Sequence, residues 1–146
     1  MMLEKAKIKE TILVIDDDPK VLASLKVGLP DYIFIPSFNG EGGLRLLKSN
    51  PKIDLVLLDY ELPDINGIEV LKRIRKSKNN IGVIFLTVNQ DKKIIVECIE
   101  NKAHSFIEKP FDFEELRKKI NAILMLTYHK KETHRTPKEH VKKVKN

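Results

Sequence analysis

Short runs with strand character recur along this chain, and each is followed by a segment whose apolar residues repeat at the spacing of a helix. These runs are residues 12–15, 32–35, 55–58, 83–86 and 105–108. The first four are apolar throughout, which is typical of strands buried on both faces of a sheet. The repeat therefore predicts an α/β fold, with a five-stranded, doubly wound parallel sheet and helices on both of its faces.

Capping residues and prolines mark where several of these elements begin and end. Asp18 is placed to cap the first helix, with Pro19 at its first position, where a missing N–H costs nothing. Pro36 closes the second strand and cannot donate to a ladder, so we expect that strand at or near an edge of the sheet. Helical spacing predicts further helices over residues 40–49 and 91–101. The last predicted helix carries one apolar stripe, formed by Phe113, Leu116, Ile120, Ile123 and Leu124.

The composition narrows the class of protein. A chain of 146 residues, 42% hydrophobic and 33% charged, has the size of one globular domain. Its single cysteine, Cys98, excludes an intramolecular disulfide, and its place on an apolar helical stripe predicts a core residue. No apolar run approaches the roughly 20 residues needed to cross a bilayer, and residues 1–10 lack the apolar segment of an export signal. We therefore expect a cytoplasmic protein with no membrane contact.

Positive charge is concentrated toward the C-terminus. The formal net charge is +6, and residues 128–146 contain seven basic and two acidic side chains. The rest of the chain is close to neutral, whereas a nucleic-acid-binding domain carries a basic face on its folded body. We therefore expect no direct nucleic-acid binding by the domain itself. The predicted organisation is an N-terminal extension over residues 1–10, one domain over 11–127 and a basic tail or linker over 128–146.

Four of the predicted strands end in residues that can do chemistry. The residues are Asp16, Asp17 and Asp18 after the first strand, Asp59 after the third, Thr87 after the fourth and Lys109 after the fifth. The carboxyl ends of parallel strands meet at one edge of the sheet, where doubly wound folds bind ligands. Two carboxylates ~4 Å apart repel by about 4 kcal/mol at an effective dielectric constant of about 20, so converging acids require a cation. Carboxylates suit Mg²⁺, while a lysine and a hydroxyl can meet phosphoryl oxygens, which favours phosphoryl transfer with an aspartate as nucleophile.

Three stretches of the chain resemble the receiver domain of two-component response regulators. They are residues 12–19 (ILVIDDDP), 57–71 (LLDYELPDINGIEVL) and 106–111 (FIEKPF), in the order and spacing of that family. The resemblance covers about residues 10–127. It implies the flavodoxin-like fold of CheY-like proteins, with the strand order 2-1-3-4-5.

The resemblance also implies a role for each residue at the strand ends. Asp59 would accept a phosphoryl group from a sensor histidine kinase or a phosphotransfer protein. Mg²⁺, with Mn²⁺ as a substitute, would be held by Asp16, Asp17, Asp59 and the backbone carbonyl of Glu61. Lys109 and the Thr87 hydroxyl would contact the phosphoryl oxygens, and the peptide bond between Lys109 and Pro110 would be cis.

A conformational switch is implied as well. Thr87 and Phe106 would move together on phosphorylation and reshape the face formed by the fourth helix, the fifth strand and the fifth helix. This face would form a homodimer or control an output domain or partner. Such a protein is a signalling phosphoacceptor and not an enzyme, because it catalyses only its own phosphotransfer and dephosphorylation. Residues 137–146 resemble the opening of a helix-turn-helix module, so the tail is either a linker or the truncated start of an output domain for transcription regulation.

One departure from the family pattern concerns the end of the fourth helix, where the family usually has a glycine. Asn101 and Lys102 stand there instead. Asparagine tolerates a left-handed backbone conformation, whereas lysine does so poorly. We therefore expect this helix to end differently.

Two other functions fit parts of the same pattern. A haloacid-dehalogenase-like phosphatase would use Asp16 as nucleophile and Asp18 as acid, because residues 14–18 fit its motif of two apolar residues followed by Asp-x-Asp. The motif over residues 59–67 would then have no purpose. A receiver-like docking domain that is never phosphorylated is the second alternative, and it would bind Mg²⁺ without reacting with acetyl phosphate.

Overall fold

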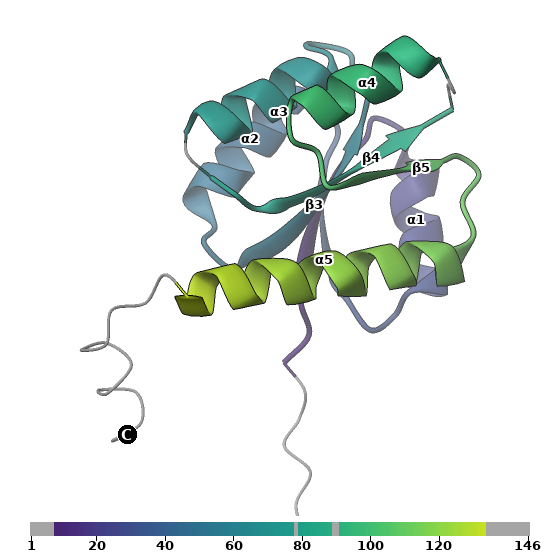
Figure 1. Cartoon of the computed structure of the whole chain (residues 1–146). Helices are drawn as coiled ribbons and strands as arrows, with labels where there is room; N and C mark the ends of the chain where they lie inside the picture. The colour runs from purple at the N-terminus through teal and green to yellow at the C-terminus, as the bar shows by residue number, and fades with distance from the viewer. Residues whose placement is uncertain (1–7, 78, 89–90, 134–146) are drawn as a thin grey trace, which may run out of the picture.

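The computed structural model describes residues 8–77, 79–88 and 91–133, in which strands and helices alternate along the chain (Figure 1). The strands are β1 (Thr11–Ile15), β2 (Ile33–Ser37), β3 (Ile53–Asp59), β4 (Gly82–Thr87) and β5 (Ser105–Glu108). The helices are α1 (Pro19–Gly28), α2 (Gly40–Ser49), α3 (Gly67–Lys76), α4 (Lys92–Glu100) and α5 (Phe113–Thr133). These strands are parallel and lie in the order β2-β1-β3-β4-β5. The predicted fold class and strand order are confirmed.

Helices cover both faces of the sheet, with α1 and α5 on one face and α2, α3 and α4 on the other (Figure 1). Successive side chains of a strand point to opposite faces, so each face has its own buried apolar cluster. Ile84 of β4 packs with Ile120 of α5 in the first cluster. Its neighbour Phe85 packs with Ile74 of α3 and Cys98 of α4 in the second. The predicted burial of Cys98 and of the apolar stripe of the last helix is therefore confirmed.

The second strand does not end at Pro36, which corrects the expectation from the sequence. β2 continues through Pro36 to Ser37, and Pro36 lies in register with Val14 of β1. An edge strand needs backbone donors on one side only, so it can accommodate a residue without an N–H. The predicted edge position of this strand is confirmed by the strand order.

The turn after α4 places a lysine in the left-handed region of backbone space. Lys102 has a φ of 68°, and no other described residue has a positive φ. The N–H of Lys102 donates to the Ile99 carbonyl, and the N–H of Ala103 donates to the Cys98 carbonyl. These two bonds form a Schellman motif, in which glycine usually holds the position of Lys102. The helix thus ends in an ordinary geometry with an unusual residue.

Arg75 of α3 holds this turn in place. Its guanidinium donates from Nη2 to the Lys102 carbonyl at 2.9 Å and from Nη1 to the carbonyls of Asn79 and Ile81 at 2.8 Å each. Burial lowers the pKa of Arg75. Because its carbonyl partners lie in two other segments, before β4 and after α4, this one side chain ties the end of α3 to both of them.

The last helix extends beyond the predicted end of the domain. α5 continues through Thr133, past residue 127, at which the sequence placed the domain boundary. Residues 1–7 of the predicted extension and residues 134–146 of the predicted tail lie outside the described residues. Within the described part of the chain, no helix combines the length with the hydropathy that a membrane-crossing helix requires.

Candidate functional site

The carboxyl ends of β1, β3, β4 and β5 surround a small polar cavity of about 230 Å³. Its lining includes Asp16, Asp17, Asp18, Asp59, Glu61, Thr87 and Lys109. The structure thus brings the residues predicted for the site together at one edge of the sheet. Asp16, Asp59 and Thr87 are buried there, at 3%, 8% and 5% exposure, so they differ from ordinary surface polar residues.

Lys109 is the cation that faces the acids. Its Nζ lies 2.6 Å from Oδ2 of Asp16 and 3.4 Å from Oδ2 of Asp59. Burial opposes the charge on Lys109, but the ion pairs with Asp16 and Asp59 outweigh it, so the pKa of Lys109 is raised. The lysine is therefore held charged at the mouth of a buried acidic cluster.

Asp59 is electrostatically strained. Burial and the negative charge of Asp16 raise the pKa of Asp59 from 3.8 to about 6, although Lys109 and a hydrogen bond from the Glu61 N–H act in the opposite direction. The positive charge of Lys109 therefore does not offset the effects of burial and of Asp16 on the pKa of Asp59. The site is built for additional positive charge.

The acids fit a divalent metal ion. Asp16, Asp17 and Asp59 each offer a carboxylate oxygen, and these three oxygens lie within 4.8 Å of one another. Oδ2 of Asp16 is buried, and its polar neighbour among the described residues is the Lys109 ammonium group, 2.6 Å away. It therefore keeps free acceptor capacity. Oxygen donors of this kind are the ligands that Mg²⁺ prefers.

Backbone contacts between strand ends fix these side chains. The N–H of Lys109 donates to the Thr87 carbonyl at 2.7 Å, which locks the end of β5 against the end of β4. The N–H of Gly67 donates to the Tyr60 carbonyl at 2.7 Å and closes the loop after β3. A Cβ at Gly67 would lie 2.4 Å from the carbonyl oxygen of Asp59, so only glycine allows this close approach of α3 to the strand.

Other predicted site residues take distinct positions. The Lys109–Pro110 peptide bond is cis. Glu61 lines the cavity and turns its N–H toward the Asp59 carboxylate. Phe106 lies on β5 with 37% of its surface exposed and belongs to neither apolar cluster.

Asp18 borders the cavity but serves a local purpose. Its carboxylate accepts a hydrogen bond of 2.9 Å from the Lys20 N–H and caps the N-terminus of α1. The phosphatase alternative needs this carboxylate as a general acid. Its engagement as a helix cap weighs against that role.

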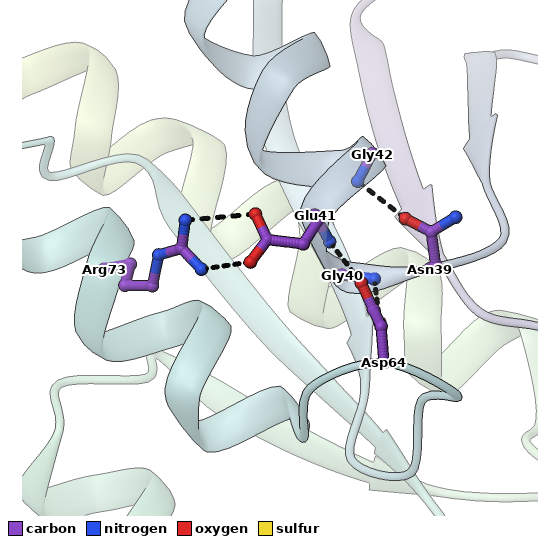
Figure 2. A network of polar contacts seen from close by, with 6 residues as sticks. All are labelled: Asn39, Gly40, Glu41, Gly42, Asp64 and Arg73. Carbon is purple, nitrogen blue, oxygen red and sulfur yellow. Dashed lines mark hydrogen bonds and ion pairs between the residues drawn. The ribbon is translucent and has the colours of Figure 1, made fainter.

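Sequence reasoning missed a polar network next to the site. Asp64, in the loop between β3 and α3, accepts hydrogen bonds from the N–H groups of Gly40 and Glu41, and Glu41 pairs with Arg73 (Figure 2). The partners of Asp64 are 23 and 24 residues away along the chain. An aspartate in a turn rich in Pro, Asn and Gly reads as a local turn residue, and no local signal identifies a distant helix as its partner.

Comparison with known proteins agrees with this geometry. A family model described as "Response regulator receiver domain" matches residues 12–121. A cyclic di-GMP phosphodiesterase of Thermotoga maritima is 34% identical over 118 residues, which are 78% of this chain and 31% of that protein. The transcriptional regulatory protein KdpE of Mycobacterium tuberculosis is 34% identical over 113 residues, which are 76% of this chain and 49% of KdpE. The chain therefore spans half of the length of these relatives or less.

A solved structure has the same fold. The response regulator receiver domain protein (CheY-like) of Methanospirillum hungatei JF-1 superposes with a TM-score of 0.78 at 26% sequence identity. The superposition covers 84% of this chain and 99% of that protein. The likeness therefore extends over most of this chain.

Proposed function

The chain belongs to the response regulator receiver family, and from this premise we propose that Asp59 is its phosphoacceptor. Receiver domains are signalling phosphoacceptors of two-component systems, and this chain is a receiver domain. The observation that carries the proposal is the position of the Asp59 carboxylate at the end of β3. It lies 3.4 Å from the ammonium group of Lys109 and beside the carboxylates of Asp16 and Asp17.

In the proposed reaction, a carboxylate oxygen of Asp59 attacks the phosphorus of a phosphohistidine. A P–O bond forms as the P–N bond breaks, and the leaving imidazole keeps the electron pair and takes a proton from water. Lys109 Nζ stabilises negative charge on one phosphoryl oxygen, and the Thr87 hydroxyl donates to another. We propose no turnover activity beyond this phosphotransfer and the later hydrolysis of the acyl phosphate.

Receiver domains bind Mg²⁺ at an acidic pocket, and the acidic cluster of this chain has the matching donors. We propose that Asp16, Asp17, Asp59 and the backbone carbonyl of Glu61 hold the ion, with Mn²⁺ as a substitute. When bound, Mg²⁺ supplies the positive charge that offsets the acids and the phosphoryl oxygens. The raised pKa of Asp59 supports this assignment, because burial and the charge of Asp16 disfavour its ionised form and a cation would favour it.

Receiver domains of response regulators interact with histidine kinases and output domains. For this chain we propose a sensor histidine kinase or a phosphotransfer protein as the phosphoryl donor. Thr87 then moves toward the phosphoryl group, and the half-exposed Phe106 turns inward behind it. The α4–β5–α5 face changes shape and controls a homodimer or an output partner.

The proposal is tested by intact mass spectrometry after incubation with acetyl phosphate and Mg²⁺. We expect the wild-type chain to gain one phosphoryl group and Asp59→Asn to gain none. The gain should disappear when Mg²⁺ is removed with EDTA, because the acids then lack their counter-charge.

Two other outcomes would contradict the proposal in different ways. No gain in the wild-type chain would favour the docking domain that is never phosphorylated. A gain that persists in Asp59→Asn and disappears in Asp16→Asn would favour the phosphatase instead.

A further inference from the structure

The loop between β3 and α3 is tied to the N-terminus of α2 by one side chain. Oδ1 of Asp64 accepts a hydrogen bond from the Gly40 N–H, and Oδ2 accepts one from the Glu41 N–H, both at 2.8 Å (Figure 2). Asn39 receives the Gly42 N–H on its side chain at 2.6 Å and the Gly43 N–H on its carbonyl at 3.2 Å. The N–H groups of Gly40, Glu41 and Gly42, which have no carbonyl partner within the helix, are thus paired, two of them by a residue from a distant loop.

The attachment by Asp64 is strong for an exposed residue. A carboxylate that binds two N–H groups at a helix N-terminus also interacts with the positive end of the helix dipole. Desolvation acts against it, but the hydrogen bonds from Glu41 and Gly40 lower the pKa of Asp64 from 3.8 to about 2. The carboxylate is therefore ionised at neutral pH.

The same loop carries the backbone of Glu61, which faces the candidate site. The Glu61 N–H donates to the Asp59 carboxylate, and Glu61 lines the cavity. Between the strand and α3, Glu61, Pro63 and Asp64 are exposed, and Leu62 is partly buried against the second apolar cluster. Apolar support comes from Ile65, whose side chain packs so closely on Gly40 that a Cβ there would lie 2.6 Å from it. Leu62 and Ile65 also pack against the second apolar cluster, so the first turn of α2 is one support of the loop, and Asp64 makes the hydrogen bonds to it.

We infer that Asp64 is a positioning residue that holds the Glu61 backbone in place for metal binding, by fastening its loop to the N-terminus of α2. The inference rests on the proposed function, since Glu61 matters only if the site holds Mg²⁺. Asp64 touches neither the metal site nor Asp59. It acts through three residues of backbone and restricts the Glu61 carbonyl and N–H to one orientation before the ion arrives.

The matching control lies on the same helix. Asn39 caps α2 through Gly42 and makes no contact with the β3–α3 loop in the described hydrogen bonds. Asn39→Ala therefore weakens the N-terminus of α2 and leaves the loop attached. Asp64→Ala weakens the same helix end and also frees the loop. A difference between these variants separates positioning from helix stability.

The test measures the Mg²⁺ dissociation constant by isothermal titration calorimetry at fixed ionic strength. We expect Asp64→Ala to raise this constant about tenfold, the lower end of the effect of outer residues that orient metal ligands. Asp64→Asn keeps one acceptor oxygen and should give an intermediate rise. Asn39→Ala should stay within about twofold of the wild-type value, although the loss of a helix cap lowers its stability.

The inference is overturned if Asp64→Ala binds Mg²⁺ like the wild-type chain, or if Asn39→Ala loses as much affinity as Asp64→Ala. A wild-type chain that binds no Mg²⁺ would overturn it together with the metal site. A wild-type chain that binds Mg²⁺ but takes no phosphoryl group at Asp59 would overturn the proposed phosphoacceptor alone. The affinities of the variants would then still decide the role of Asp64.

Discussion

Asp59 lowers the free energy of unfolding, because the site requires a carboxylate at a buried position. Its carboxyl is buried next to Asp16, and its pKa of about 6 in the folded chain exceeds the ordinary value of 3.8. An unfolded chain loses the proton of Asp59 near pH 3.8, whereas the folded chain keeps it until about pH 6. Folding therefore becomes less favourable as the pH rises between these two values, and the full cost is present above pH 6.

We predict that Asp59→Asn stabilises the metal-free protein at pH 7, because the amide removes the buried charge. The shift of about two pKa units corresponds to roughly 3 kcal/mol, and we expect a gain of about 1 to 3 kcal/mol in the free energy of unfolding. The gain should disappear at pH 4, where Asp59 is protonated in the folded wild-type chain. Urea unfolding in EDTA at both pH values, followed by circular dichroism, measures this difference.

The exposed acid Glu100 provides the control for this measurement. Glu100→Gln removes one negative charge from the surface and should change the unfolding free energy little at either pH. An equal gain for Asp59→Asn at pH 4 and at pH 7 would contradict the electrostatic explanation.

At the scale of an element, the end of α4 carries a local conflict between residue and backbone. Lys102 adopts a φ of 68° so that the last carbonyls of α4 are capped and its own carbonyl can accept from Arg75. A left-handed conformation costs a residue with a Cβ about 1 to 2 kcal/mol. Glycine avoids this cost but loses more chain entropy on folding.

We predict that Lys102→Gly raises the free energy of unfolding by about 0.5 to 1 kcal/mol, because the backbone strain ends while the carbonyl contact with Arg75 stays. Lys102→Ala is the matched control, since it removes the same side chain and keeps the Cβ. It should give no gain. Chemical denaturation of both variants at pH 7 decides the matter, and equal stabilisation by alanine and glycine would contradict the role of strain.

At the scale of the whole molecule, the two apolar clusters share one sheet. Ile84 of β4 belongs to the cluster under α1 and α5, and Cys98 belongs to the cluster on the opposite face. The Cys98 side chain is buried, so a thiol reagent reaches it only when the fold opens, and burial also raises the pKa of its thiol to about 11. Cys98, the single cysteine of the chain, therefore reports on the second cluster without further labels.

We predict that Ile84→Ala speeds up labelling of Cys98 from across the sheet. Truncating a buried isoleucine lowers the free energy of unfolding by about 2 to 5 kcal/mol. If the domain unfolds as one unit, the fraction of unfolded molecules rises at least thirtyfold. Stopped-flow reaction with a thiol reagent in excess measures the rate. Val27→Ala, at an exposed position of α1, is the control and should leave the rate unchanged. Unchanged labelling in Ile84→Ala would mean that the two faces unfold independently.

The sequence by itself determined the order and kind of the elements, the edge position of the second strand, and the residues at the strand ends. These follow from local physics: apolar runs, helical spacing, caps and prolines act on neighbours in the chain. The convergence of Asp16, Asp59, Thr87 and Lys109 was predictable too, because all parallel strands end at one edge. The continuation of β2 through Pro36 was missed, since the absence of a donor matters only if a neighbouring strand needs it.

Only the tertiary structure decided which distant groups meet and how strongly. Nothing near Asp64 in the sequence identifies α2 as its partner, and nothing near Arg75 identifies the Lys102 carbonyl. The pKa of Asp59 depends on burial and on the charge of Asp16, which lies on another strand. Such interactions depend on distances in space between segments that the fold brings together. A local pattern of residues does not determine those distances.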